Sequence, residues 1–534
     1  MKARYDTIPT LVRWAGEQFG DHEALVDPAP DGEVRLSYVA LVEAVHRAGR
    51  AFMASGLEPG DCVGVWAPNA WEWVVAGLGV HEAGGVVVPI NTRFKGREGA
   101  YVLAKSKARM LVTVTDFMGI DYVELLAGAE DLPDLREVVV LRGPTRGSTT
   151  SFDDFLDRAD HVDDLERAAR SGAVAADDLC LTMFTSGTTG MPKGVMITHG
   201  QVLRGFSDWS RIIGLRSDDR YLIINPYFHF FGLGAGILSC LMTGATNLPH
   251  PVFDVPAVMR RVDEERISVL PGPPAIYQTI LNDPDLGNYD LSTLRLAVTG
   301  AAVVPVDLVV QMRDRLGFET VLTGYGLTEN SGLATICRRE DDPETVATTS
   351  GRAMPGMDIR VVDTEGNEMM PGEPGEIWVS GYGVMKGYLD DPEQTAEAVD
   401  DDGWLHTGDI GTMDAGGNVA VTDRLKDMFI VGGFNAYPAE IESMMGAHPD
   451  LAQVAVVGIP DQRLGEVGVA FAIPTAGTMP DPQEVIAWCR REMANYKVPR
   501  QVHIVDQLPL NASNKVLKYE LRLSAISDLE SEVG

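Results

Sequence analysis

The segment FTSGTTGMPKG, from Phe184 to Gly194, places three glycines, four hydroxyl residues and one lysine within eleven positions. Glycines allow the backbone to approach an anion closely, and consecutive N–H groups then form a concave site for phosphate oxygens. The hydroxyl groups add donors, and Lys193 adds a positive charge. Because an apolar stretch precedes the segment and a β-branched stretch follows it, we expect an ordered phosphate-binding loop and not a flexible linker.

This loop differs from the Walker P-loop. Met191 and Pro192 separate Gly190 from Lys193, whereas the Walker motif places Gly, Lys and Ser or Thr side by side. The sequence also contains no GxGxxG, HExxH or GxSxG motif. These absences argue against the commonest dinucleotide-binding, metalloprotease and hydrolase sites.

The elements around the loop predict a sheet that delivers loops to one edge. The segment from Tyr38 to about Pro89 follows the order helix, strand, helix, strand, and β-branched stretches recur at ARMLVTVTD, REVVVLRG, RISVLPGPP and LRLAVTGAA. Strands that alternate with helices of about 10–15 residues indicate a parallel sheet wrapped by helices. Ligands bind at the carboxyl edge of such sheets.

The pattern changes after Gly351. The segments DIRVVDTEGNEMMPGEPGEIWVSG and GNVAVTDR predict hairpins of a small antiparallel β unit, and α/β alternation resumes after Arg424. We therefore expect an α/β fold with two domains joined by a hinge near Lys426. Residues 1–425 would form a large N-terminal domain that includes the β unit, and residues 426–534 a smaller α+β C-terminal domain.

The net charge of −33 argues against nucleic acid and anionic lipid as partners. The five cysteines are scattered and form no CxxC pair, which favours reduced thiols in the cytoplasm. The N-terminus does not have the pattern of a signal peptide, and no apolar stretch fits an integral membrane segment.

The motifs, taken in order, resemble those of the acyl-adenylate-forming superfamily, which includes acyl-CoA synthetases, aryl-CoA ligases, peptide-synthetase adenylation domains and firefly-type luciferases. The phosphate loop matches the family signature residue for residue. The other matching motifs are LSYVAL, AGGVVVPIN, GYGLTE, GEIWVSGYGVMKGYL, GWLHTGDIG, TDRLKDMFIVGGFNAYPAEIE and LPLNASNKVLK. They span nearly the whole chain, and they imply a ligase that forms acyl-AMP from ATP and a carboxylic acid and then transfers the acyl group to CoA.

The resemblance assigns nucleotide and metal roles. Tyr325 would stack on adenine, Thr328 would hold the α-phosphate, and Glu329 together with Thr185 would bind Mg²⁺. Asp409 would accept both ribose hydroxyls. The residues expected to bind ATP or AMP are Thr185, Ser186, Gly187, Thr188, Thr189, Gly190, Lys193, Gly300, Ala301, Ala302, Gly324, Tyr325, Gly326, Thr328, Asp409, Arg424 and Lys515.

Lys515 is the residue expected to stabilise the charge that builds at the α-phosphorus. The family has Gly where this chain has Asn514, and Asn also tolerates a left-handed backbone. The full catalytic set expected from the resemblance is Lys515, Thr328, Glu329 and His229.

The acyl and CoA sites rest on weaker patterns. His229 matches a family loop at the acyl pocket, although a lone His in an apolar stretch is more often structural, and glycines at 232, 234 and 236 suggest room for a bulky acid. The expected acyl-binding residues are His229, Phe230, Phe231, Gly232, Thr299, Ser331 and Gly332. The expected CoA-binding residues are Gly432, Gly433 and Phe434, and the expected hinge is Lys426.

CoA ligase is the expected class, because the sequence shows no inserted segment around Lys426 of the kind that restricts rotation in carrier-loading relatives. Several stretches resemble actinobacterial synthetases, including those that act on steroid-ring propionates, and medium- or long-chain fatty acids and aryl acids stay open. The alternative is an adenylate-binding sensor without catalysis, but the presence of both Lys515 and Glu329 argues against it. The sequence leaves a homodimer open.

Overall fold

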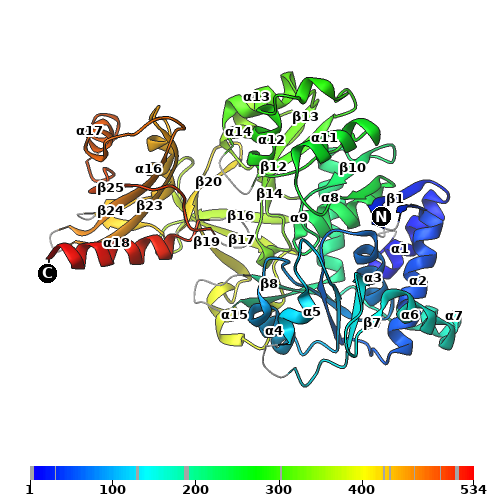
Figure 1. Ribbon diagram of the computed structural model, residues 1–534. Helices are drawn as coiled ribbons and strands as arrows, with labels where there is room; N and C mark the ends of the chain where they lie inside the picture. Colours follow the sequence, from blue (N-terminus) through cyan, green and yellow to red (C-terminus); the bar gives the residue numbers. More distant parts are fainter. Residues whose placement is uncertain are drawn as a thin grey trace. The chain divides into compact units, whose positions relative to one another are not determined.

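The computed structural model describes residues 5–30, 32–127, 132–185, 192–300, 304–424, 427–431, 434–461, 464–493, 495–510 and 516–533. The chain forms two compact units (Figure 1). The first comprises Met1–Ile359, Val379–Leu405 and Gly416–Asn418, and the second comprises Arg360–Trp378, His406–Ala415 and Val419–Gly534.

An eight-stranded sheet organises the first unit, with the strand order β18-β9-β8-β4-β3-β5-β6-β7. Its strands are β3 Cys62–Trp66, β4 Val86–Pro89, β5 Met110–Val114, β6 Glu137–Arg142, β7 Thr150–Ser151, β8 Leu179–Thr185, β9 Lys193–Thr198 and β18 Gly387–Tyr388. The pairs from β8 to β7 are parallel, and β9 and β18 add antiparallel strands at one side. The parallel sheet expected from the sequence is confirmed.

Helices wrap this sheet in the order that the sequence predicts between Tyr38 and Pro89. Helix α2 Tyr38–Ala54 precedes β3, and α3 Trp71–Glu82 connects β3 to β4. Helix α3 is buried from Glu72 to Glu82, so its two carboxylates need partners. Arg142 donates to both oxygens of Glu72 at 2.7 Å, and Arg167 donates to Glu82.

The remaining helices of the first unit lie around its sheets (Figure 1). They are α1 Ile8–Phe19, α4 Gly96–Lys105, α5 Tyr122–Leu126, α6 Phe152–Asp157, α7 Asp164–Gly172, α8 His199–Ile213, α9 Phe230–Gly232, α10 Ser239–Thr243, α11 Val255–Glu264, α12 Pro274–Leu281, α13 Val306–Asp314, α14 Pro343–Thr348 and α15 Pro392–Ala398.

Two four-stranded sheets complete the first unit, with the orders β10-β11-β1-β2 and β12-β13-β14-β15. Their strands are β1 Glu23–Ala29, β2 Gly32–Ser37, β10 Arg220–Ile223, β11 Thr246–Pro249, β12 Leu296–Gly300, β13 Thr320–Tyr325, β14 Thr335–Ile336 and β15 Arg352–Ala353. The predicted strand at RISVLPGPP is reduced to bridges from Val269 to Tyr221 and Leu296. Three prolines follow Leu270 within four residues, and proline cannot donate to a ladder.

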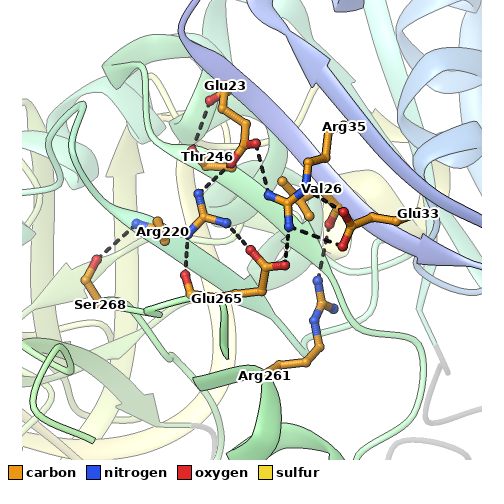
Figure 2. A network of polar contacts seen from close by, with 9 residues as sticks. All are labelled: Glu23, Val26, Glu33, Arg35, Arg220, Thr246, Arg261, Glu265 and Ser268. Atoms are coloured by element: carbon orange, nitrogen blue, oxygen red, sulfur yellow. Dashed lines mark hydrogen bonds and ion pairs between the residues drawn. The ribbon is translucent and has the colours of Figure 1, made fainter. Parts of the chain in front are cut away.

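A ring of alternating charges fastens the β1–β2 hairpin to the rest of the first unit, as Figure 2 shows. Glu23 accepts from Arg35 at 3.1 Å and from Arg220 at 2.5 Å. Glu265, which follows α11, binds the same two guanidinium groups. Burial acts to raise the pKa of Glu23, but the hydrogen bonds from the two arginines outweigh it and lower the pKa below 4.5.

The second unit contains a five-stranded sheet with the order β22-β21-β24-β23, and β25 pairs in parallel with β24. The elements are β21 Phe429–Val431, β22 Phe434–Ala436, α16 Pro438–Met445, β23 Leu451–Asp461, β24 Gly465–Pro474, α17 Pro482–Glu492, β25 Gln501–Ile504 and α18 Lys518–Val533. Alternate residues of β23 and β24 enter two cores. One contains Ile441 of α16 and Ile486 of α17, and the other contains Leu521 of α18.

The predicted antiparallel β unit is a four-stranded sheet with the order β16-β17-β19-β20. Its strands are β16 Met357–Val362, β17 Gly375–Gly381, β19 Trp404–Met413 and β20 Val419–Arg424. Strands β19 and β20 pair antiparallel, with Asp409 opposite Arg424. Among the described residues, no helix is long and apolar enough to cross a membrane.

We predict that Glu23→Gln destabilises the first unit by about 1–3 kcal/mol at pH 7, because it removes a charged acceptor shared by two arginines. A lowered folded-state pKa gives stability that is present above 4.5 and is lost as the pH falls through the folded-state pKa. The difference between wild type and variant in thermal unfolding should therefore be constant above pH 4.5 and shrink as the pH falls below it.

Glu33→Gln is the matched control, because Glu33 pairs with the same Arg35 but its side chain is 48% exposed. Exposed pairs contribute at most about 1 kcal/mol. Equal effects of the two substitutions, or a Glu23→Gln effect that does not change with pH, would contradict the role of the ring.

Candidate active site

The hairpin of β8 and β9 holds both ends of the predicted phosphate loop. Thr185 is the last residue of β8 and Lys193 the first of β9, and the two are partners in the antiparallel register. Ser186, Gly187, Thr188, Thr189 and Gly190 lie outside the described residues. The loop is therefore closed at its base, with a hydroxyl residue on one strand and an ammonium on the other.

The Lys193 ammonium contacts the side chains of Gln394 and Tyr388. It donates to Gln394 of α15 and lies 4.9 Å from the centre of the Tyr388 ring. The Tyr388 hydroxyl in turn donates to Glu329 Oε1 at 3.0 Å. Tyr388 therefore links the cation of the phosphate loop to the carboxylate of the GYGLTE motif.

The GYGLTE motif begins at the end of a parallel strand pair. Strands β12 and β13 run in parallel register, with Gly300 opposite Gly324. Gly300 has φ +153°, and a Cβ there would lie 2.8 Å from the Gly324 carbonyl oxygen. Thr299, Gly300, Gly324 and Tyr325 thus meet at one carboxyl edge, and Ala301 and Ala302 lie outside the described residues.

A tight turn fixes Thr328 and Glu329. A Cβ on Gly326 would lie 2.2 Å from the Gly332 carbonyl oxygen, so the two ends of the turn touch through backbone. The Gly332 N–H donates to the Leu327 carbonyl at 2.8 Å, and the Met385 N–H donates to the Glu329 carbonyl at 2.8 Å. The backbone that carries the Glu329 side chain is therefore hydrogen-bonded both within the turn and to Met385.

The predicted acyl-binding residues converge on the end of this turn. Ser331 has φ +60°, and its hydroxyl donates to the Gly383 carbonyl at 2.7 Å. A Cβ on Gly332 would lie 2.6 Å from Phe230 Cβ. Phe230 is buried beside Phe206 of α8, with ring centres 6.1 Å apart. Phe230 is therefore packed against Gly332 at the end of the turn.

His229 itself begins the short helix α9. Its Nδ1 accepts a hydrogen bond from the Phe231 N–H at 3.2 Å, and its side chain is exposed. Phe231 is half-buried. The chain continues as a π-helix from Leu233 to Leu238, a wide form of helix often found at functional sites.

The expectation that the glycines after His229 leave room for a bulky acid is wrong. A Cβ on Gly232 would lie 2.2 Å from the Pro226 carbonyl oxygen, and one on Gly234 would lie 2.0 Å from the Phe206 ring. A Cβ on Gly236 would lie 2.7 Å from Ile223. Backbone and side-chain atoms of the protein already fill the space beside these glycines, so the missing side chains leave no room there for a ligand.

The second unit carries the other predicted nucleotide residues. Asp409 is buried in β19, and its N–H donates to the Thr407 hydroxyl at 3.1 Å. Arg424 ends β20 and Phe434 begins β22. Lys426, Gly432, Gly433 and Lys515 lie outside the described residues.

Sequence reasoning missed Tyr388 and Gln394. Tyr388 belongs to the motif GEIWVSGYGVMKGYL, which supported the resemblance without any role for its tyrosine. Gln394 belongs to no motif, and its place beside Lys193 depends on the pairing of β18 with β9. Only the three-dimensional arrangement identifies either residue.

Comparisons with known proteins give consistent results along the chain. Residues 12–389 match the family described as AMP-binding enzyme, and residues 440–515 match its C-terminal domain. Two ligases named 3-[(3aS,4S,7aS)-7a-methyl-1,5-dioxo-octahydro-1H-inden-4-yl]propanoyl:CoA ligase, from Rhodococcus jostii (strain RHA1) and Mycobacterium tuberculosis (strain ATCC 25618 / H37Rv), are each 48% identical over 97% of this chain and 98% of their own length.

A solved structure, ATP-bound MatB from Rhodopseudomonas palustris, superposes with a TM-score of 0.84 at 30% identity. The match covers 97% of this chain and 99% of that one. The fold class expected from the sequence is therefore confirmed over almost the full length of both chains.

We predict that Gly234→Ala lowers the stability of the first unit by about 1–3 kcal/mol through overpacking against Phe206. Because the glycine lines no acyl space, residual activity towards small and bulky carboxylic acids should fall by the same factor. Thermal unfolding and kcat/KM for acids of increasing size measure both effects.

Gly205→Ala on the neighbouring helix α8 is the control. Its Cβ would meet only ordinary contacts, at 3.7 Å from the Tyr382 hydroxyl and 3.8 Å from Leu333. It should be neutral or slightly stabilising, since alanine favours a helix. A Gly234→Ala variant of wild-type stability that rejects only bulky acids would restore the glycines as pocket residues.

Proposed function

The chain belongs to the AMP-binding enzyme family and is an acid–CoA ligase, and we propose that its acid is a propionate attached to a fused-ring system. The reaction has two halves. First, a carboxylate oxygen bonds to the α-phosphorus of ATP and pyrophosphate leaves. Next, the CoA sulfur bonds to the acyl carbon and AMP leaves.

The observation that carries the choice of acid is the 48% identity to two ligases of a methyl-dioxo-octahydroindenyl propionate over 97–98% of both chains. Fatty acids and aryl acids are the alternatives. The buried Phe230 and the Ser331–Gly332 turn support an apolar acyl site with fixed walls, which suits a rigid ring system better than a long flexible chain.

The phosphates of ATP are assigned to the β8–β9 loop. The pairing of Thr185 with Lys193 supports this assignment, because it brings the two ends of the loop together beside a hydroxyl residue and an ammonium. Lys193 would exchange Gln394 for phosphate oxygens. The close approach of Gly300 and Gly324 supports an adenine slot of backbone walls beside Tyr325.

The residues around Glu329 fit Mg²⁺. Tyr388 donates to Oε1, and no hydrogen bond from the part of the chain that the structure describes reaches Oε2, which leaves one carboxylate oxygen for a cation. Among the described residues no group of three or more acidic, His or Cys side chains is arranged to hold a metal ion. The cation would therefore be shared between one carboxylate, ATP phosphates and water. Bound Mg²⁺ would supply charge neutralisation, and Glu329, joined by Thr185, would hold it.

The remaining assignments rest on the resemblance of the motifs. Asp409 would bind the ribose, and its burial supports a structurally constrained carboxylate. Arg424 would contact the ribose or the phosphates, Lys515 would serve adenylation, and Gly432, Gly433 and Phe434 would border the CoA channel. Residues 1–425 and 426–534 would act as two domains that turn about Lys426 between the half-reactions.

The proposal includes a cytoplasmic location, where ATP and CoA are available. Free small molecules are the proposed partners, because a net charge of −33 disfavours nucleic acid.

We expect the fused-ring propionate to be the preferred acid. Its kcat/KM should exceed those of octanoate, palmitate and a cinnamate by at least about tenfold, the discrimination expected of a shaped apolar pocket. The measurement is acyl-CoA formation from each acid at fixed MgATP and CoA. A higher kcat/KM for a fatty or aryl acid would overturn the choice of substrate and leave the ligase class intact.

Lys515→Ala should slow acyl-AMP formation by about 10²–10³-fold, because a charge aimed at the transition state is lost. Thioester formation from synthetic acyl-AMP should stay near the wild-type rate. Lys518→Ala is the control, since Lys518 already pairs with Glu442 at 2.8 Å and should be dispensable for both steps. Equal loss in both half-reactions of the Lys515 variant would show that its assignment is wrong.

A further inference from the structure

Tyr388 is anchored by its backbone to the strand that follows the phosphate loop. Strand β18 pairs antiparallel with β9, with Tyr388 opposite Val195. The Leu389 N–H donates to the Gly194 carbonyl at 2.7 Å, and the Tyr388 N–H donates to the Thr395 hydroxyl at 2.8 Å. Any shift of Tyr388 would therefore disturb hydrogen bonds on both sides.

The side chain of Tyr388 contacts two groups of opposite charge. Its hydroxyl donates to Glu329 at 3.0 Å, and its ring centre lies 4.9 Å from the Lys193 ammonium. A negative carboxylate favours the hydroxyl end, and the electron-rich ring face favours the cation. Because the tyrosine is only 8% exposed, little water competes with either contact.

The Tyr388 hydroxyl is a donor to the Glu329 carboxylate, so this hydrogen bond restrains Oε1 and stabilises the charged carboxylate.

We propose that Tyr388 is a positioning residue for adenylation, which sets Glu329 and Lys193 in place before MgATP binds. The proposal rests on the assigned roles of those two residues. The Tyr388 hydroxyl fixes the carboxylate through Oε1 and leaves Oε2 for Mg²⁺, and the ring supports the ammonium on the phosphate side. Preorganised charges need no rearrangement when the triphosphate arrives.

Two substitutions separate the contacts. Tyr388→Phe removes the hydroxyl and keeps the ring, so the Mg²⁺ concentration for half-maximal rate should rise about 3- to 10-fold while the ATP KM at saturating Mg²⁺ changes little. Tyr388→Leu also removes the ring, so the ATP KM should rise as well. Acyl-AMP formation followed by pyrophosphate release gives both quantities, and thermal unfolding reports any general loss of structure.

Tyr382→Phe is the matched control. Tyr382 also lies beneath a cation, with Arg204 at 4.0 Å from its ring centre, but it is half-buried and its hydroxyl has no hydrogen-bond partner in the part of the chain that the structure describes. Removing that hydroxyl should leave the Mg²⁺ requirement unchanged. An equal shift in both variants would mean that a buried phenol acts only through stability, and the proposal would fail.

Binding of MgATP to Glu329→Gln, measured by calorimetry, separates this proposal from the metal assignment. If Tyr388 acts on the cation by positioning Glu329, MgATP binding weakens in Glu329→Gln, and adding Tyr388→Phe to that variant weakens it no further. If the Glu329 variant loses affinity but Tyr388→Phe alone keeps the wild-type Mg²⁺ requirement, the positioning role is wrong and the metal site stands. If Glu329→Gln binds MgATP normally, the metal assignment fails, and the positioning role fails with it.

Discussion

The structure must bind anions on a chain that carries a net charge of −33. ATP, a carboxylate and CoA are all negative, and the overall field of the protein opposes their approach. The positive potential that attracts these substrates therefore has to come from groups held in place at the site itself. At the base of the β8–β9 loop, which we propose as the phosphate site, Lys193 lies over an aromatic ring and beside an amide oxygen without a carboxylate contact among the described residues. A direct ion pair there would cancel the charge that the proposed phosphate contact needs.

The same constraint explains why so much of the site is backbone. The contacts of Gly300 with Gly324 and of Gly326 with Gly332 bring main chains closer than any side chain would allow. Backbone N–H groups attract anions without adding a charge that the acidic surface would neutralise. Glu329, which we propose as the Mg²⁺ ligand, is restrained by the Tyr388 hydroxyl and by the backbone bond from Met385. These two bonds keep its negative charge in a defined position.

The sequence predicted those features that depend on local pattern. The stretches on either side of the phosphate loop were expected from their apolar and β-branched residues, and the pairing of β8 with β9 confirms both strands. LRLAVTGAA was expected to be a strand that stops at glycine, and β12 confirms it. Features that depend on what lies across the fold were missed or misread. Gly234 was interpreted as pocket space because its partner, Phe206, is 28 residues away in the chain. RISVLPGPP was predicted as a strand, whereas Val269 forms isolated bridges to Tyr221 and Leu296 there. No role was predicted for Tyr388 because its partners, Lys193 and Glu329, belong to two other motifs.

This acidic chain activates a carboxylate by adenylation, and we propose that the reaction takes place around Lys193 and Glu329. Exchange of labelled pyrophosphate into ATP is the decisive measurement, because exchange requires reversible formation of acyl-AMP. We expect exchange that depends on the fused-ring propionate and on Mg²⁺ and that proceeds without CoA. Formation of acyl-CoA without any such exchange, or exchange that requires CoA, would contradict it.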